Sequence, residues 1–180
     1  AAAWLMATFW WLYISMHVYG GLPGWLAALA VLLLAAALAL YYALACGLWL
    51  LARPALGAIR QALLWATLWL LAELCRGVLF TGFPWGATGY AHVDSLLAGY
   101  APWLGVYGIG ALAAFLSAVL GQTAQRVFAW RKVQGGGRRR FPVIAAMLVV
   151  IVLAPGWWLK RASVSALQPI SGESGVHVAL

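Results

Sequence analysis

Acidic side chains are almost absent from this sequence. Its 180 residues include 3 Asp or Glu against 11 Lys or Arg, and only 8% of them are charged. Soluble globular domains carry about 25% charged and about 45–50% apolar residues, whereas 66% of this chain is hydrophobic. So few charged side chains leave too little polar surface to keep a monomer of this size in water. The composition therefore excludes an ordinary soluble domain and predicts an integral membrane protein.

Reactive side chains are scarce as well. The two cysteines, Cys46 and Cys75, lie inside apolar runs with neither pairing nor metal-ligand spacing between them. His92 and Asp94 stand two positions apart, which is too little for a metal site. The sequence holds no Ser-His-Asp array, P-loop or HExxH motif. We therefore expect no cofactor, no metal site and no catalytic residue in these 180 positions.

Long apolar runs are what the sequence does contain. About 20 helical residues cross a hydrocarbon core about 30 Å thick, and five runs meet or approach that length: 1–19, 25–51, 62–80, 101–120 and 142–159. Many of the 12 Trp and 7 Tyr stand near the ends of these runs, as in the aromatic belts of membrane proteins. Ten-residue alternating strands are lacking. The predicted fold is all-α, a polytopic bundle of about five transmembrane helices.

The basic residues predict the orientation of the bundle. Arg53 and Arg60 lie in one connection, and a second basic connection lies at 121–141, two spans further on. Connections rich in Lys and Arg stay in the cytoplasm, so both are expected there, with 81–100 and the C-terminus on the opposite face. Orientation and contact with anionic lipid account for the net charge of +8, and no nucleic-acid partner is expected.

Small residues at four-residue spacing predict where helices pack closely in lipid. Two such strips occur, Ala35, Ala39, Ala43 and Gly47 in the second run, and Gly110, Ala114 and Ala118 in the fourth.

Glu73 and Arg76 are the only oppositely charged residues inside one predicted span, and their spacing of three places them on one helical face. A charge at membrane depth costs at least about 2.5–3.5 kcal/mol, so such residues usually pair and face the protein interior. Two interpretations remain open. The residues form a structural ion pair, or Arg76 helps to hold a phospholipid headgroup or an acyl donor near the outer face.

The stretch 76–85, Arg-Gly-Val-Leu-Phe-Thr-Gly-Phe-Pro-Trp, followed by Gly89-Tyr90, is the most informative part of the sequence. Its glycines and its proline end the helix, and its aromatic residues stand where the chain leaves the membrane. The pattern predicts an ordered re-entrant or interfacial turn. Because irregular backbone at membrane depth must line protein or a cavity, this turn is expected to border a groove that lipid enters.

Three stretches, 11–23, 76–90 and 101–108, resemble in this order the membrane region of apolipoprotein N-acyltransferases, and the similarity extends over roughly 10–168. The resemblance implies transfer of an acyl chain from a phospholipid to the N-terminal diacylglyceryl-cysteine of a bacterial lipoprotein at the inner membrane. In that family a Glu-Lys-Cys triad in a periplasmic nitrilase-like domain performs the reaction. The implied partners are a phospholipid acyl donor, a diacylated apolipoprotein and membrane lipids.

No counterpart of that triad is found in this sequence. The segment 162–168 alternates as the first strand of the nitrilase-like domain would, so we expect a transmembrane domain at 1–159 and the truncated start of a periplasmic domain at 160–180. An upstream part is also expected to be missing, and the chain alone is expected to be inactive. The resemblance and the residue patterns together give substrate-binding candidates, Arg76, Phe83, Trp85 and Tyr90, and structural candidates, Glu73, Gly82, Pro84, Gly105 and Gly108.

Two other functions stay open at this point. The chain could be a stand-alone membrane transporter or scaffold subunit with Glu73 and Arg76 on its pathway, although the paired repeats typical of transporters are not seen. It could also be an accessory protein that docks a partner through Arg138, Arg139 and Arg140.

Overall fold

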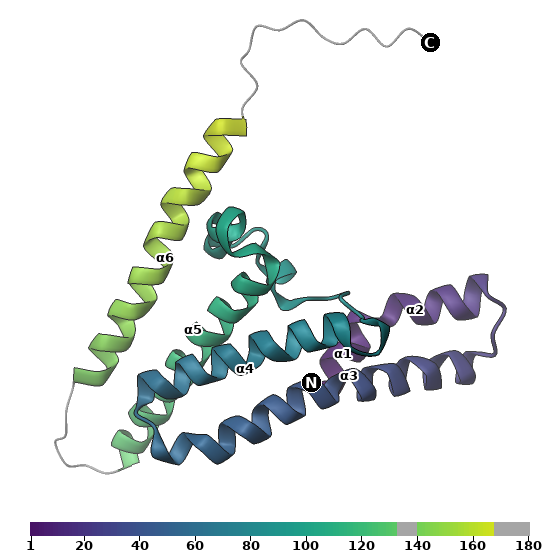
Figure 1. Ribbon diagram of the computed structural model, residues 1–180, viewed down its shortest axis with the longest axis horizontal. Helices are drawn as coiled ribbons and strands as arrows, with labels where there is room; N and C mark the ends of the chain where they lie inside the picture. Colours follow the sequence, from purple (N-terminus) through teal and green to yellow (C-terminus); the bar gives the residue numbers. More distant parts are fainter. Residues whose placement is uncertain (133–139, 168–180) are drawn as a thin grey trace, which may run out of the picture.

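The computed structural model describes residues 1–132 and 140–167, and every regular element in these two ranges is helical (Figure 1). Side chains are described for 1–80, 82–126 and 146–161. The prediction of an all-helical fold is confirmed for these residues. Among them, three helical segments are long and apolar enough to cross a membrane: Gly24–Ala55, Ala58–Val78 and Leu96–Arg126. They coincide with the predicted runs 25–51, 62–80 and 101–120.

The three helices at the centre of the fold are α3 (Gly24–Ala52), α4 (Ala58–Val78) and α5 (Ala101–Lys132). Pro23, whose backbone is extended, precedes α3, and a single turn, η2 (Arg53–Ala55), ends it at Pro54. Helix α4 packs against α3 on one side and against α5 on the other. It therefore lies between the other two long helices.

The first predicted span is not one continuous helix. It consists of α1 (Ala2–Thr8), α2 (Trp10–Ile14) and η1 (Ser15–Tyr19), a π-helical turn, with a break at Phe9. Both α1 and α2 pack along α3, and Phe9 turns into the core, where it is 1% exposed. The predicted span over 1–19 is therefore not confirmed as a single helix: the backbone bends at Phe9, whose ring is buried.

The fifth predicted span lies within α6 (Arg140–Leu167), which is longer than expected. The helix passes the turn η5 (Leu96–Tyr100) at close range, since a Cβ at Gly99 would overlap the carbonyl oxygen of Gly156. The strand expected at 162–168 is not confirmed: 162–167 continue α6, and 168–180 lie outside the described residues. A helix satisfies its own backbone hydrogen bonds, whereas a strand needs a neighbouring strand.

The packing strips agree with the prediction only in part. Gly110 and Ala114 of α5 are buried, as predicted. On α3 Ala35 is buried but Ala43 is exposed, and the buried face passes instead through Tyr42 and Ala45. The predicted strip on α3 is therefore wrong beyond Ala39. The buried face of α3 carries Tyr42, whose hydroxyl binds Glu73, in place of Ala43.

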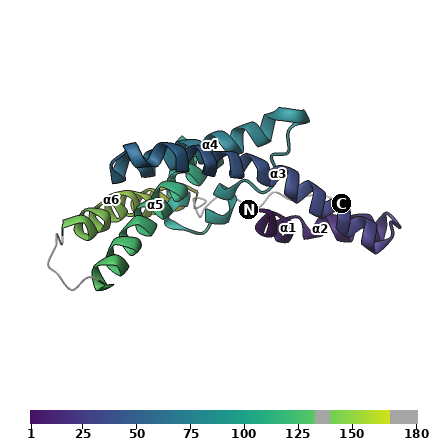
Figure 2. The ribbon, with the colours of Figure 1, turned by 90° about the horizontal axis from the view of Figure 1, so that it is seen from below.

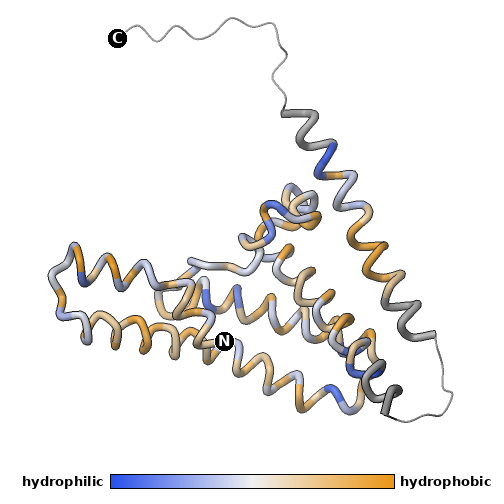
Figure 3. The backbone as a smooth tube through the Cα atoms, turned by 180° about the vertical axis from the view of Figure 1, so that it is seen from behind, coloured by the Kyte–Doolittle hydropathy of each residue, from blue (hydrophilic) through white to orange (hydrophobic). Residues whose placement is uncertain are grey.

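Most polar residues of the described chain gather at helix ends, and apolar residues cover the middle of α3 and α5 (Figure 3). The α3–α4 turn and the C-terminal end of α5 lie at the same end of the bundle, while the irregular segment between α4 and α5 lies toward the other end (Figures 1 and 2). Both basic connections therefore begin at one end of the bundle, as the charge pattern requires.

Candidate functional site

Two buried charged side chains lie on the last two turns of α4. Glu73 is 0% exposed and Arg76 is 1% exposed, and they are the buried charged residues of the described chain. Their spacing of three places them on the same face of the helix. That face is directed toward the segment that leaves α4, so both charges are available to bind its backbone.

Arg76 holds the beginning of this segment. Its Nη1 donates to the carbonyl oxygens of Phe83 (2.8 Å) and Trp85 (2.7 Å), and the Phe83 N–H donates back to the Arg76 carbonyl (2.8 Å). The chain reverses direction at Gly82, where φ is +75° and a Cβ would overlap the Gly77 carbonyl oxygen. Only glycine adopts this turn without strain, which explains the residue type at this position.

Glu73 holds the other end of the same segment. Its Oε1 accepts a hydrogen bond from the Thr88 N–H (2.9 Å) and one from the Tyr42 hydroxyl of α3 (3.3 Å). The Trp69 Nε1–H donates to the Thr88 hydroxyl (3.1 Å). Residues 83–88 are thus bound at their start by the guanidinium and at their end by the carboxylate. We call residues 82–90 the clamped loop.

Helix α5 closes over the far end of the clamped loop. A Cβ at Gly110 would lie 2.5 Å from the Thr88 hydroxyl and 3.2 Å from Glu73 Oε2, and a Cβ at Gly89 would overlap the Val106 carbonyl oxygen. These two glycines bring the α5 backbone and the loop backbone into direct contact. The carboxylate is therefore enclosed by α3, α4, α5 and the loop together.

Glu73 and Arg76 do not contact each other directly. Among the described residues, no salt bridge or hydrogen bond joins the two side chains, and Glu73 Oε2, Arg76 Nε and Arg76 Nη2 are buried without a hydrogen-bond partner there. The loop backbone connects the two charges. A buried anion and a buried cation one helical turn apart still stabilise each other through space, because the low dielectric strengthens their attraction.

The aromatic candidates of the loop differ in their surroundings. The ring of Phe83 packs edge-on against Phe9, with centroids 5.0 Å apart, whereas Trp85 is 62% exposed and lies 5.9 Å from Trp11. Tyr90 is 59% exposed. Phe83 thus fixes the loop to the core, and Trp85 and Tyr90 face the surroundings. The structure brings Arg76, Phe83 and Trp85 together and leaves Tyr90 outside their contacts.

The remaining structural candidates lie around the same end of the bundle. Pro84 lies between Phe83 and Trp85, the two residues whose carbonyls Arg76 binds. Gly105 has φ +61° and bends α5 near its start. A Cβ at Gly108 would lie 2.7 Å from Leu104 Cβ of the preceding turn.

Sequence reasoning missed two residues of this site, Tyr42 and Thr88, because they come from α3 and the loop and no pattern in the sequence connects them with Glu73. Trp69 could be placed on the helical face of Glu73 and Arg76 from its spacing, but not as a partner of Thr88. Gly110 was predicted as a packing residue of α5, without its contact to Glu73. Within the described residues no group of His, Cys, Asp or Glu is arranged to hold a metal ion. The arrangement positions a loop.

Comparison with known proteins identifies a family for this architecture. Residues 1–119 match the family described as apolipoprotein N-acyltransferase N-terminal domain. An apolipoprotein N-acyltransferase of Ralstonia nicotianae is 46% identical over 169 residues, which cover 93% of this chain and 29% of that protein. One of Verminephrobacter eiseniae is 62% identical over 117 residues, 65% of this chain and 22% of that protein.

A putative apolipoprotein N-acyltransferase of Bordetella parapertussis is 43% identical over 179 aligned residues, which cover 91% of this chain and 32% of that protein. The chain thus spans about a third or less of the length of these relatives. The clamped loop lies inside the part matched by the family.

Proposed function

This chain belongs to the apolipoprotein N-acyltransferase family, and on that premise we propose that it is the membrane domain of an enzyme that transfers an acyl chain from a phospholipid to the diacylglyceryl-cysteine of a lipoprotein. Acyltransferase names among its relatives and three apolar helices support this assignment. In the proposal the domain, residues 1–159, anchors the enzyme in the bacterial inner membrane and shapes the entrance for lipid.

The clamped loop is the observation that carries the proposal. Two buried charges hold an irregular segment at the end of an apolar bundle, where an unbound backbone would be costly. The same loop presents Trp85 and Tyr90 outward. Rigid aromatic rings on a fixed loop suit contact with acyl chains and headgroups at the membrane boundary. We assign this surface to the entry of the phospholipid donor and the lipoprotein substrate.

Within this proposal Arg76 is a positioning residue. Its guanidinium is buried and binds two loop carbonyls, so a headgroup reaches it only if the loop opens. Arg76 therefore acts on the substrate through Phe83 and Trp85. Glu73 has the corresponding role at Thr88. A transporter pathway through Glu73 would need access to water, which the enclosure of this carboxylate by three helices opposes.

We further propose that the catalytic Glu-Lys-Cys triad of the family lies outside this chain. Cys46 and Cys75 belong to α3 and α4, where neither has the periplasmic setting that the thioester chemistry requires. The chain alone is therefore expected not to acylate a diacylated lipopeptide in phospholipid vesicles. Formation of triacylated product by the purified chain, detected by mass spectrometry, would show this part of the proposal to be wrong.

A chimera tests the function itself. In the enzyme from Ralstonia nicotianae, the 169 aligned residues are replaced by those of this chain, and N-acylation of a diacylated lipopeptide is measured in proteoliposomes. We expect activity in the chimera, a large loss with Arg76→Met, and little change with the exposed control Arg60→Met. An inserted, folded chimera without activity contradicts the proposal, and so does equal activity of the two variants.

The orientation is part of the same proposal. The α3–α4 turn and the end of α5 face the cytoplasm, and the clamped loop faces the periplasm together with the end of α6. The charge distribution supports this arrangement. The resemblance implies a catalytic domain in the periplasm, so we assign the entrance to the periplasmic face.

A further inference from the structure

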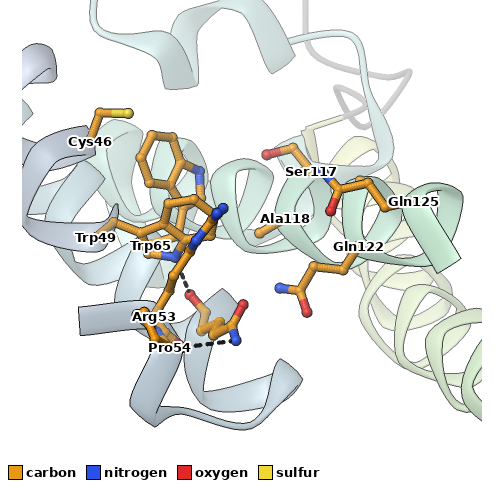
Figure 4. A pocket seen from close by; sticks show the side chains of 11 residues that line it. Cys46, Trp49, Arg53, Pro54, Trp65, Ser117, Ala118, Gln122 and Gln125 are labelled. Atoms are coloured by element: carbon orange, nitrogen blue, oxygen red, sulfur yellow. Dashed lines mark hydrogen bonds between the residues drawn. The ribbon is translucent and has the colours of Figure 1, made fainter. Parts of the chain in front are cut away.

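A cavity of about 610 Å³ lies at the end of the bundle opposite the clamped loop (Figure 4). Its walls come from the C-terminal end of α3, the turn η2, the first turns of α4, and α5. The residues that line it are Cys46, Trp49, Arg53, Pro54, Gln61, Trp65, Ser117, Ala118, Gly121, Gln122 and Gln125. Its volume lies within the range of about 300–1,000 Å³ that is typical of small-molecule sites.

One wall of the cavity is cationic and rigid. The guanidinium of Arg53 lies over the ring of Trp49, 5.2 Å from its centroid. The side chain of Gln61 donates through Nε2 to the backbone carbonyls of Arg53 (3.0 Å) and Leu56 (2.8 Å). The backbone carbonyl of Gln61 accepts a hydrogen bond from Trp49 Nε1 (2.9 Å). These bonds fix the backbone of the turn that carries Arg53. The exposed guanidinium is placed beside the cavity by its contact with the Trp49 ring.

The opposite wall offers neutral hydrogen-bond donors. Gln122 extends from α5 toward the turn that carries Arg53 (Figure 4). Its Nε2 is buried, and no hydrogen-bond partner for it exists among the described residues. Ser117, whose hydroxyl already donates to the Ala114 carbonyl (2.8 Å), and Gln125 line the same wall, and none of the lining residues is acidic. A buried amide N–H without a partner costs free energy that a ligand acceptor would recover.

We propose that this cavity is a binding site for a phosphate group, carried either by an anionic lipid headgroup or by a small soluble phosphate ester. The planar guanidinium matches phosphate oxygens with several donors at once, and Gln122 supplies a further donor from the other side. The cavity lies at the ends of three apolar helices beside two Trp rings, where lipid headgroups lie. Basic residues at such a boundary attract anionic lipid.

This site is independent of the proposed acyl-transfer entrance, because it lies at the other end of the bundle and shares no lining residue with the clamped loop. Its ligand is retained at the site and is not consumed. An anionic lipid bound here would connect the α3–α4 turn with α5, since its phosphate would contact Arg53 of η2 and Gln122 of α5.

The test uses the purified, delipidated 180-residue chain and native mass spectrometry, with phosphatidylglycerol, phosphatidylcholine and glycerol phosphate as separate probes. We expect phosphatidylglycerol or glycerol phosphate to bind and phosphatidylcholine to bind more weakly than phosphatidylglycerol. Arg53→Gln should weaken binding roughly tenfold, as the loss of a charge-assisted hydrogen bond does. Gln122→Glu, which keeps the side-chain volume but places a negative charge in the cavity, should weaken binding at least as much.

Arg60→Gln is the matched control, since Arg60 lies on the first turn of α4, close in sequence to Arg53, and does not line the cavity. We expect it to change the affinity less than about twofold, as an exposed charge does. Binding of glycerol phosphate that competes with phosphatidylglycerol identifies a soluble ester as sufficient, and binding of the lipid alone identifies the headgroup. Equal weakening by Arg53→Gln and Arg60→Gln, or no binding of either anionic probe, overturns the proposal. Circular dichroism of each variant verifies that the helices are intact.

Discussion

Replacement of Arg76 by methionine tests the central structural claim, that a buried guanidinium holds the clamped loop. Methionine keeps much of the apolar stem and removes both hydrogen bonds, to the carbonyls of Phe83 and Trp85. Hydrogen bonds to charged groups contribute about 1.5–3 kcal/mol each. The change also leaves the buried carboxylate of Glu73 without the nearby cation. Removing one partner of a buried charged pair costs about 3–5 kcal/mol, and we expect a loss of free energy of unfolding in that range.

The loss is measured by reversible unfolding in mixed micelles with increasing dodecyl sulfate. Hydrogen exchange over residues 82–90 supplies a local readout, because the amides of Phe83 and Thr88 donate from the clamped loop to Arg76 and Glu73 of α4. Their exchange should be faster in Arg76→Met. Arg76→Lys should have an intermediate effect, since an ammonium is a point donor without the planar fork of arginine.

Arg60→Met provides the control, because Arg60 is exposed and lies at the far end of α4. It removes the same charge and should change stability by less than about 1 kcal/mol. If Arg76→Met and Arg60→Met lower stability equally, or if exchange in the loop is the same in Arg76→Met and the parent chain, the clamp described above does not exist.

Three further predictions concern the same region. Gly89→Ala places a methyl group against the Val106 carbonyl and should destabilise the chain by about 1–3 kcal/mol in the same unfolding assay; an unchanged midpoint would refute the close approach of loop and α5. Glu73→Gln keeps the side-chain volume but weakens the hydrogen bond from the Thr88 N–H, so hydrogen exchange at Thr88 should be faster. The same variant should leave solute flux in liposomes unchanged. A flux that the substitution abolishes would favour the alternative function of a transporter. Ser95→Cys, in a background without the two native cysteines, should react with an impermeant maleimide from the periplasmic side, and labelling from the cytoplasmic side alone would reverse the proposed orientation.

The burial of Glu73 and Arg76 could be predicted from the sequence, but their hydrogen-bond partners could not. Two opposite charges one turn apart in an apolar run indicate burial against protein, because lipid does not solvate them. The structure shows both buried, yet each binds the loop backbone, and Tyr42, 31 residues before Glu73, is a further hydrogen-bond donor to the carboxylate. Long-range partners of this kind depend on how α3 is rotated about its axis, and the sequence pattern misplaced that rotation beyond Ala39.

The sequence by itself determined the membrane character, the positions of three apolar helices and the gathering of basic residues in two connections. These properties follow from transfer free energies and charge, which are carried by each residue whatever its neighbours. Only the tertiary structure decided that the first run breaks at Phe9, that 162–167 continue a helix, and that residues from three helices enclose both the carboxylate of Glu73 and the cavity beside Arg53. Those features arise from packing between segments that are distant in the chain, because the side chains of one segment determine which backbone conformation fits against it in the other.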